Sequence, residues 1–183
     1  MNHDPLDVNE PHGYSKDRQL RKGPKDPTPK LKVTPAILLR AVLAHYSQRY
    51  AGPVAMALEV GLENEGETQR RRVDGLLLRY YKPPIAFEVK VSRADWLSEL
   101  KKPDKHLPAK AFAGQLYVVA PPDVVKVEEL PAGVGLIEVK PYTSKVKFVQ
   151  RAERCQPADL GWGWHRVAQI AAGVLRAADE GVV

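Results

Sequence analysis

Two carboxylates and a lysine, Asp74, Glu88 and Lys90, lie within segments rich in strand-forming residues. Two carboxylates a few ångströms apart favour a bound cation, because like charges at short range resist simultaneous ionisation. Oxygen ligands of this kind suit Mg²⁺ or Mn²⁺. A lysine beside such a metal can stabilise a bound hydroxide or the charge of a pentavalent phosphorane. The three residue types together suit hydrolysis of a phosphodiester.

These side chains meet only if their segments pair. Arg72–Tyr81 and Ile85–Ser92 both have the pattern of strands, and the three residues between them are too few for a crossover helix. We therefore expect an antiparallel hairpin. A turn centred near Lys82 makes the numbers of paired residues sum to roughly 164, so Asp74 would face Lys90 directly.

Side chains alternate along a strand, so Asp74, Glu88, Lys90 and Ser92 are expected on one face. Glu88 would be the diagonal neighbour of Asp74. The backbone carbonyl of Val89 points at the same edge and is a further candidate metal ligand. A register shift of one residue would move Asp74 to the other face and remove the site.

Two alternatives bear on this interpretation. Glu-X-Lys is a common tripeptide, and a solvated strand face with an Asp74–Lys90 ion pair would also contain it. The sequence contains a second copy, Glu138-Val139-Lys140, with Asp123 upstream. We favour the first copy because Asp123 begins a proline-bounded segment, where it would cap a helix. The second copy also runs directly into a proline and a turn, with no helix behind it.

The remaining pattern predicts an α/β layer architecture, because helical and strand-like segments follow each other along the chain. The expected helices are 35–50, an interrupted 93–113, a short 123–130 with Asp123 as N-cap, and 164–179; the further expected strands are 54–62, 115–120, 134–139 and 145–150.

The motif and its context resemble a known superfamily. Asp74, a hairpin and then Glu88-Val89-Lys90 look like the PD-(D/E)XK nucleases. The run from Glu88 to Asp104 resembles the MmcB-like branch, a group of DNA-repair-associated proteins, and the resemblance covers about residues 54–140. It implies a restriction-endonuclease-like core with a central mixed sheet of four to six strands flanked by helices. It also implies metal-dependent DNA cleavage, with Asp74 and Glu88 as ligands and Lys90 as catalytic lysine.

The sequence departs from the superfamily pattern in two ways. The superfamily often supplies another acid from its first helix, and residues 35–50 contain none. Glu59 on the following strand is the best substitute ligand, against an ordinary exposed strand glutamate. Val73 stands where the literal motif has proline, which matters little because the carboxylate does the chemistry.

Basic and polar residues around the motif are candidate phosphate contacts. The alternatives are a solvated basic face and, for Ser92, a helix N-cap that forms a capping box with Asp95. The candidates for nucleic-acid binding are Arg70, Arg71, Arg72, Ser92, Lys101, Lys102 and Lys105.

Composition bounds the domain organisation. The 183 residues carry a formal net charge of +6, which permits nucleic acid as a partner. Residues 1–34 hold five of the 16 prolines and few long apolar residues, so we expect a disordered, basic, proline-rich arm. Residues 35–183 would form one domain, with a core at 35–120 and a C-terminal hairpin and helix at 134–180. The single cysteine excludes an internal disulfide, and no apolar segment could cross a bilayer, so we expect a cytoplasmic protein.

The leading hypothesis is a Mg²⁺- or Mn²⁺-dependent DNA nuclease that acts in DNA repair or processing. One alternative is a catalytically silent DNA-binding or repair scaffold with the same fold. The other is a partner-binding accessory protein. The residues do not discriminate DNA from RNA, and cutting both strands of a duplex would need two sites, which a homodimer would supply.

Overall fold

The computed structural model describes residues 32–61, 72–79, 82–102, 107–156 and 164–182. The chain divides into two units, Met1–Lys30 and Leu31–Val183, and the second contains every helix and strand below. The predicted disordered arm lies outside the described residues, except for its last three positions.

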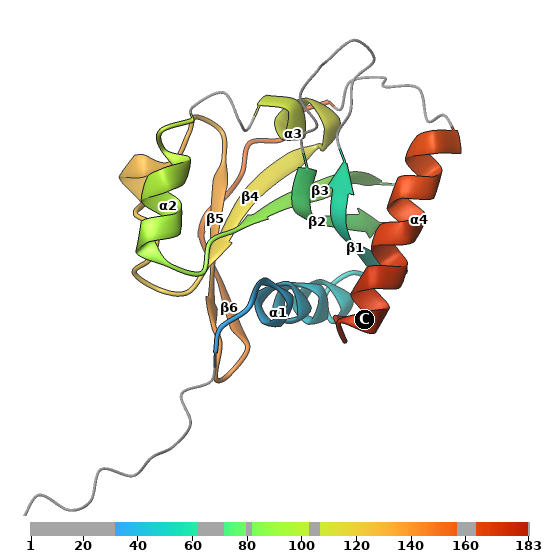
Figure 1. Ribbon diagram of the computed structural model, residues 1–183, viewed down its shortest axis with the longest axis horizontal. Helices are drawn as coiled ribbons and strands as arrows, with labels where there is room; N and C mark the ends of the chain where they lie inside the picture. Colours follow the sequence, from blue (N-terminus) through green and yellow to red (C-terminus); the bar gives the residue numbers. More distant parts are fainter. Residues whose placement is uncertain (1–31, 62–71, 80–81, 103–106, 157–163, 183) are drawn as a thin grey trace, which may run out of the picture. The chain divides into compact units, whose positions relative to one another are not determined.

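A single mixed sheet of six strands forms the centre of this unit, with the strands in chain order (Figure 1). β1, β2 and β3 are antiparallel, β3, β4 and β5 are parallel, and β6 returns antiparallel. The predicted α/β class with a mixed sheet flanked by helices is confirmed. The strands are β1 (Val54–Gly61), β2 (Arg72–Arg79), β3 (Lys82–Val89), β4 (Gln115–Ala120), β5 (Gly135–Lys140) and β6 (Lys145–Gln150).

The first helix begins where its capping residue predicts. Thr34 caps the first helix, its hydroxyl accepting from the Ile37 N–H at 3.4 Å, and Pro35 occupies the first helical position. No helix of the described residues has the length and apolar character needed to cross a membrane. The helices are α1 (Pro35–Ser47), α2 (Arg93–Glu99), α3 (Leu107–Phe112) and α4 (Trp164–Asp179), with a 3-10 turn, η2, at Val127–Glu129.

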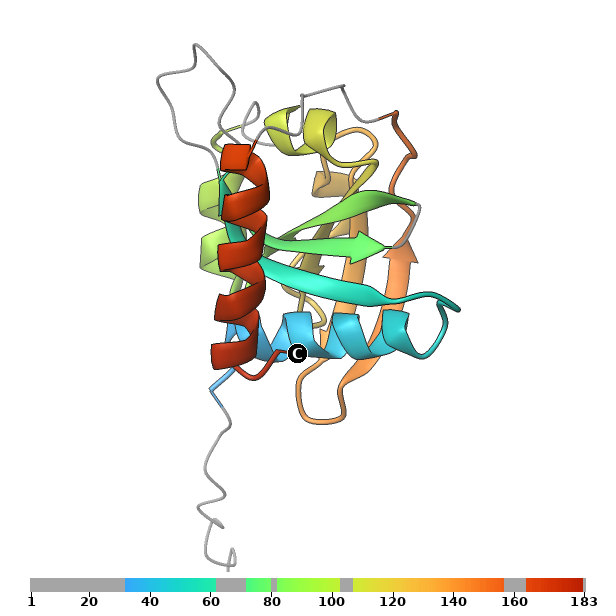
Figure 2. The same cartoon turned by 90° about the vertical axis from the view of Figure 1, so that its right-hand side faces the viewer.

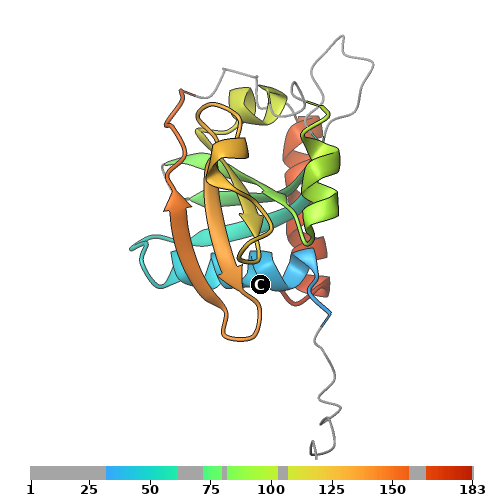
Figure 3. The same ribbon diagram turned by 90° about the vertical axis from the view of Figure 1, so that its left-hand side faces the viewer.

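The sheet has a hydrophobic cluster on each face. Leu38 and Leu39 of α1 pack against one face, beside Phe87. On the other face, Trp96 of α2, Phe112 of α3 and Ile170 of α4 belong to a second cluster that includes Leu76 and Ala86. Figure 2 shows α4 beside β1, and Figure 3 shows α2 and the β5–β6 hairpin. By strand alternation, Asp74 and Glu88 belong to the second face.

The predicted limits of the third strand were wrong at both ends. β3 begins at Lys82, includes Pro83 and Pro84, and ends at Val89 rather than Ser92. Prolines are tolerated at the start of a strand because they lack only the N–H. Pairing with β4 begins at Ile85, after both prolines.

The expected short helix at 123–130 was also wrong. Asp123 does not cap a helix: its φ is 66°, in the left-handed region, and the segment contains only η2. Asp tolerates this conformation better than most residues because its short side chain bonds locally.

Candidate active site

The hairpin register differs from the predicted one by two residues. Gly75 pairs with Phe87, and Leu76 with Ala86. Continuing this register places Asp74 opposite Glu88, so the predicted Asp74–Lys90 pairing was wrong. Two features set this register: Arg79 already pairs with Lys82, and an irregularity between Leu77 and Arg79 shifts the pairing by one residue beyond it. Alternation has a period of two, so the shift leaves Asp74 on the predicted face.

Asp74 lies where β2 and β3 stop pairing. Its Oδ2 accepts a hydrogen bond from the backbone N–H of Val89 at 2.7 Å. The carboxylate thus takes the place of a backbone carbonyl of β2 as the acceptor for β3. The N–H and C=O of one strand residue point toward the same neighbouring strand. The Val89 carbonyl, the predicted further ligand, therefore also faces β2 at this point.

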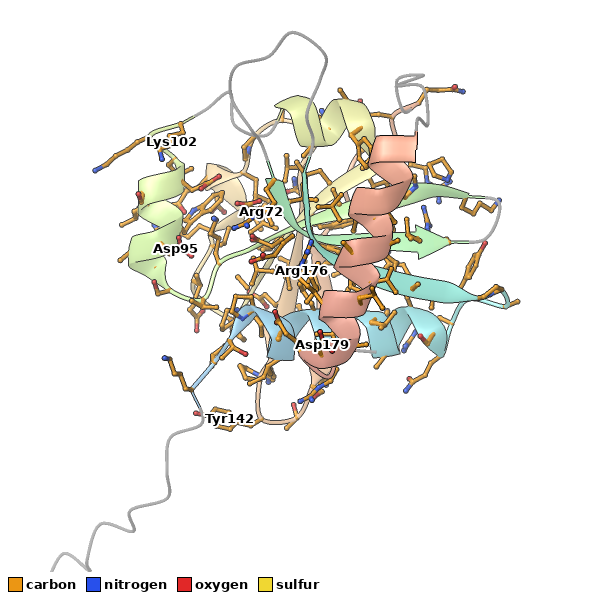
Figure 4. The ribbon with its side chains drawn as sticks, turned by 45° about the vertical axis from the view of Figure 1, so that its right-hand side comes forward. Arg72, Asp95, Lys102, Tyr142, Arg176 and Asp179 are labelled. Atoms are coloured by element: carbon orange, nitrogen blue, oxygen red, sulfur yellow. The ribbon has the colours of Figure 1, made fainter. Side chains whose placement is uncertain are left out.

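The ammonium of Lys90 lies among three carboxylates. Its Nζ is 3.1 Å from Glu88 Oε1, 3.2 Å from Glu99 Oε2 and 3.9 Å from Asp95 Oδ1. We call these four residues the Lys90 cluster. Glu88, Lys90 and Glu99 are only 4–7% exposed, whereas the Asp95 side chain is 43% exposed. The cluster therefore opens to solvent at Asp95, which Figure 4 shows on α2.

Helix α2 supplies Asp95 and Glu99 because its start is capped directly after the motif. The hydroxyl of Ser92 accepts from the Asp95 N–H at 3.2 Å, so the N-cap interpretation of Ser92 is confirmed. The Asp95 carboxylate, expected to complete a capping box, lies near Lys90. Asp95 and Glu99 are four residues apart and therefore share one helix face.

Glu129 of η2 holds α2 in place from outside the motif. It forms an ion pair with Arg93, and its Oε2 accepts from the indole N–H of Trp96 at 2.8 Å. These hydrogen bonds, chiefly those from Arg93, lower the pKa of Glu129 to about 2. Arg93 also donates to the carbonyl of Val124 at 3.2 Å. The connection between β4 and β5 thus positions the helix that carries two members of the Lys90 cluster.

Glu59, the predicted substitute ligand, lies on β1 in the register position opposite Asp74. Its φ is 52°, and β1 is irregular there. Its carboxylate is 3.3 Å from the guanidinium of Arg72, and both side chains are exposed. Arg176 of α4 donates to the carbonyls of Leu58 and Glu59, so α4 braces the irregular residue (Figure 4). The structure places Glu59 beside Asp74 in the sheet, with its carboxylate engaged by Arg72.

The predicted nucleic-acid contacts are only partly described. Arg72 is exposed at the start of β2, and Lys101 and Lys102 are exposed just after α2. Arg70, Arg71 and Lys105 lie outside the described residues. Of the predicted catalytic residues, Asp74 bonds to the backbone of Val89, and Lys90 contacts Glu88, at the point where β2 and β3 stop pairing.

Sequence reasoning did not assign Glu99 to the site. A signal was present, because Asp95 and Glu99 flank the apolar Trp96 at a spacing that puts both acids on one face. Helix α1 contains no acid, whereas α2 supplies a buried acid, Glu99, that contacts Lys90.

The fold is similar to that of a solved structure. A protein of unknown function from Silicibacter pomeroyi is 21% identical, over 83% of this chain and 91% of that chain, with a TM-score of 0.55. This likeness shows the α/β fold. Neither a protein-family model nor a curated protein matches the sequence.

The donor atoms fit a hard divalent cation. In the part of the chain that the structure describes, no three His, Cys, Asp or Glu side chains form a ready metal cluster. Mg²⁺, however, commonly uses one or two protein carboxylates and completes its octahedron with water and substrate oxygens. Asp74, Glu88 and the Val89 carbonyl offer that kind of incomplete, all-oxygen set.

Proposed function

We propose that this protein is a metal-dependent DNA nuclease of the PD-(D/E)XK superfamily, in its MmcB-like branch. One observation carries the proposal: at the point where β2 and β3 stop pairing, Asp74 accepts from the backbone N–H of Val89, the residue after Glu88, and Lys90 contacts Glu88. The all-oxygen donor set and the adjacent lysine are the combination that hydrolysis of a phosphodiester needs.

The charge of the site supports a cation. Among the described residues, the carboxylates of Glu88, Asp95 and Glu99 lie 3.1–3.9 Å from the Lys90 ammonium. Asp74 adds a further negative charge beside Val89. Carboxylates gathered at short range favour a bound cation.

Each residue has a distinct role in this proposal. Mg²⁺ or Mn²⁺ held by Asp74, Glu88 and the Val89 carbonyl would polarise the scissile phosphate and supply a hydroxide nucleophile. Lys90, held by Glu88 and Glu99, offers ammonium protons to the oxygen on which negative charge develops. Ser92 caps α2 and thereby fixes Asp95 and Glu99 around that ammonium. The exposed Lys101 and Lys102 would contact the DNA backbone.

The proposal places this activity in DNA repair or processing in the cytoplasm, where a lone Cys155 remains reduced. A silent DNA-binding scaffold with the same fold is the alternative that the same experiment separates. It would bind DNA with strong salt dependence and without a metal requirement.

The test compares two matched carboxylate substitutions. Asp74→Asn removes the charge while its amide oxygen can still accept from the Val89 N–H, so the strand junction is retained. The control is Glu138→Gln in the second Glu-Val-Lys, a β5 side chain whose neighbour is Lys147 at 3.8 Å. DNA cleavage with Mg²⁺ or Mn²⁺ is measured beside Mn²⁺ binding by calorimetry.

We expect Asp74→Asn to reduce cleavage at least about 100-fold, the scale of losing a group that stabilises transition-state charge. It should also weaken Mn²⁺ binding, while Glu138→Gln behaves as wild type. Equal cleavage by all three proteins would exclude the assigned site. Salt-dependent DNA binding without Mn²⁺ binding or cleavage would support the scaffold alternative.

A further inference from the structure

A second candidate site lies at the opposite end of the β2–β3 hairpin. A cavity of about 260 Å³ is lined by Tyr50, Arg79, Lys82, Gln115, Arg154 and Cys155, together with a proline and a glycine. Arg79 lies five residues from Asp74 along β2, which is roughly 17 Å in an extended strand. The cavity is therefore separate from the Lys90 cluster.

The lining is cationic. Arg79, Lys82 and Arg154 bring three positive charges to the cavity, and none of the described residues that line it is acidic. Within the described part of the chain, none of the three forms an ion pair. Cations gathered at a cavity without acids attract an anion, because their mutual repulsion otherwise opposes the folded state.

Arg79 has a donor that the protein does not use. One terminal nitrogen of its guanidinium donates to the carbonyl of Pro83, whereas the buried Nε has no hydrogen-bond partner. A buried donor without a partner costs free energy. Burial chiefly, and also the charge of Arg154, lower the pKa of Arg79, while Tyr46 and Tyr50 act in the opposite direction.

The walls of the cavity are tied together by the backbone. The N–H of Gly114 donates to the carbonyl of Pro84 at 3.0 Å, and the N–H of Cys155 donates to the carbonyl of Gly114 at 2.9 Å. The start of β3, the start of β4 and the segment after β6 are thus fixed to one another. Arg79, Gln115 and Arg154 therefore project from joined elements, so binding a ligand requires little ordering.

We propose that this cavity binds a phosphate group. Its volume is below that of drug-sized pockets, which fits a small oxyanion or the end of a longer ligand. Guanidinium groups match the oxygens of phosphate with paired hydrogen bonds, and Lys82 adds a point charge. The phosphate would be inorganic phosphate or the terminal phosphate of a nucleic-acid strand, and both present the same oxygens.

Cys155 provides a direct assay because it is the only cysteine of the chain and lines the cavity. The rate of its alkylation by iodoacetamide is measured in full-length protein with inorganic phosphate, a 5′-phosphorylated oligonucleotide or the 5′-hydroxyl oligonucleotide. Sodium chloride at matched ionic strength is the reference. A ligand at ten times its Kd should slow alkylation about tenfold.

Three variants relate protection to the cations. Arg79→Gln and Lys82→Ala should each weaken protection, by about 10-fold or more for Arg79, because a charge-assisted hydrogen bond is lost. Lys145→Ala on β6, an exposed lysine that does not line the cavity, is the matched control and should protect as wild type. Lys82 is exposed, so its variant tests the site even if Arg79→Gln fails to fold.

Protection by inorganic phosphate beyond chloride, lost in the Lys82 variant, would support the proposal with a free phosphate as ligand. Protection by the 5′-phosphorylated oligonucleotide alone would support it with a strand end as ligand. Protection no greater than that of chloride in every arm would overturn it, as would equal protection in the Arg79, Lys82 and Lys145 variants.

Discussion

Lys90→Met provides the most direct test of the Lys90 cluster as an electrostatic unit. Methionine retains much of the apolar stem of lysine but leaves Glu88 and Glu99 without the ammonium at 3.1 and 3.2 Å. Both side chains are at least 92% buried, so water has little access to replace the lost partner. Breaking a buried ion pair from one side costs about 3–5 kcal/mol, which is a large part of the stability of an ordinary domain.

A second substitution separates the charge effect from packing. Glu99→Gln keeps the shape of the side chain and removes one of the two negative charges that lose the ammonium of Lys90. The double variant Lys90→Met/Glu99→Gln should therefore recover about 1–3 kcal/mol relative to the sum of the single variants. If Lys90→Met destabilises by packing alone, the two substitutions would be additive instead.

The assay is urea unfolding followed by circular dichroism, with equal m-values required before the free energies are compared. Lys145→Met, an exposed lysine on β6, is the control and should change the free energy of unfolding by less than about 0.5 kcal/mol. A Lys90→Met variant within about 1 kcal/mol of wild type would refute the electrostatic account of the cluster.

Two further predictions concern the elements around the site. Because the pKa of Glu129 is lowered to about 2, its contribution to stability is present above the usual value near 4.5 and disappears as the pH falls toward 2. Glu129→Gln should therefore lower the free energy of unfolding at pH 6. It should also reduce the loss of that free energy between pH 4.5 and pH 2, measured by urea unfolding at each pH. Parallel plots of unfolding free energy against pH for wild type and variant would contradict this. Gly173→Ala should lower the free energy of unfolding by about 1–3 kcal/mol, because a Cβ on α4 would lie 2.7 Å from the carbonyl oxygen of Leu58. A rise in the melting temperature, as helix propensity alone predicts, would contradict that account.

Local signals predicted most of the fold. The N-cap and proline at Thr34-Pro35 begin α1, and the predicted limits of Gln115–Ala120 and Trp164–Asp179 match β4 and α4. The prediction failed at Pro83 and Pro84, because a proline is a turn signal in sequence but is tolerated at the start of a strand before pairing is complete. Only the pairing partners of a residue decide between these outcomes, and a short segment does not contain them.

The part of the candidate site that depends on side-chain alternation along the strands was predictable from the sequence. The two-residue register error preserved the face of Asp74, whereas a one-residue error would have removed it. Glu99 was not assigned because its position depends on how α2 packs back on β3. Trp96 and Glu129, which fix that packing, are 33 residues apart. A contact of this separation is set by tertiary structure and leaves no local pattern.

The same packing joins the stability of α2 to the charge of the site. α2 has only seven residues, too few to be stable alone, so it depends on Trp96, on the Arg93–Glu129 ion pair and on Lys90. Lys90 in turn needs Asp95 and Glu99 of α2 because its ammonium is buried. A divalent cation at Asp74 and Glu88 would repel this ammonium. The ammonium would then interact less with Glu88 and more with the carboxylates of Asp95 and Glu99 on α2. We therefore expect the backbone amide hydrogen exchange of α2 to change more on binding of Mn²⁺ than that of any other helix or strand. Unchanged exchange in α2 on saturation with Mn²⁺ would contradict this coupling.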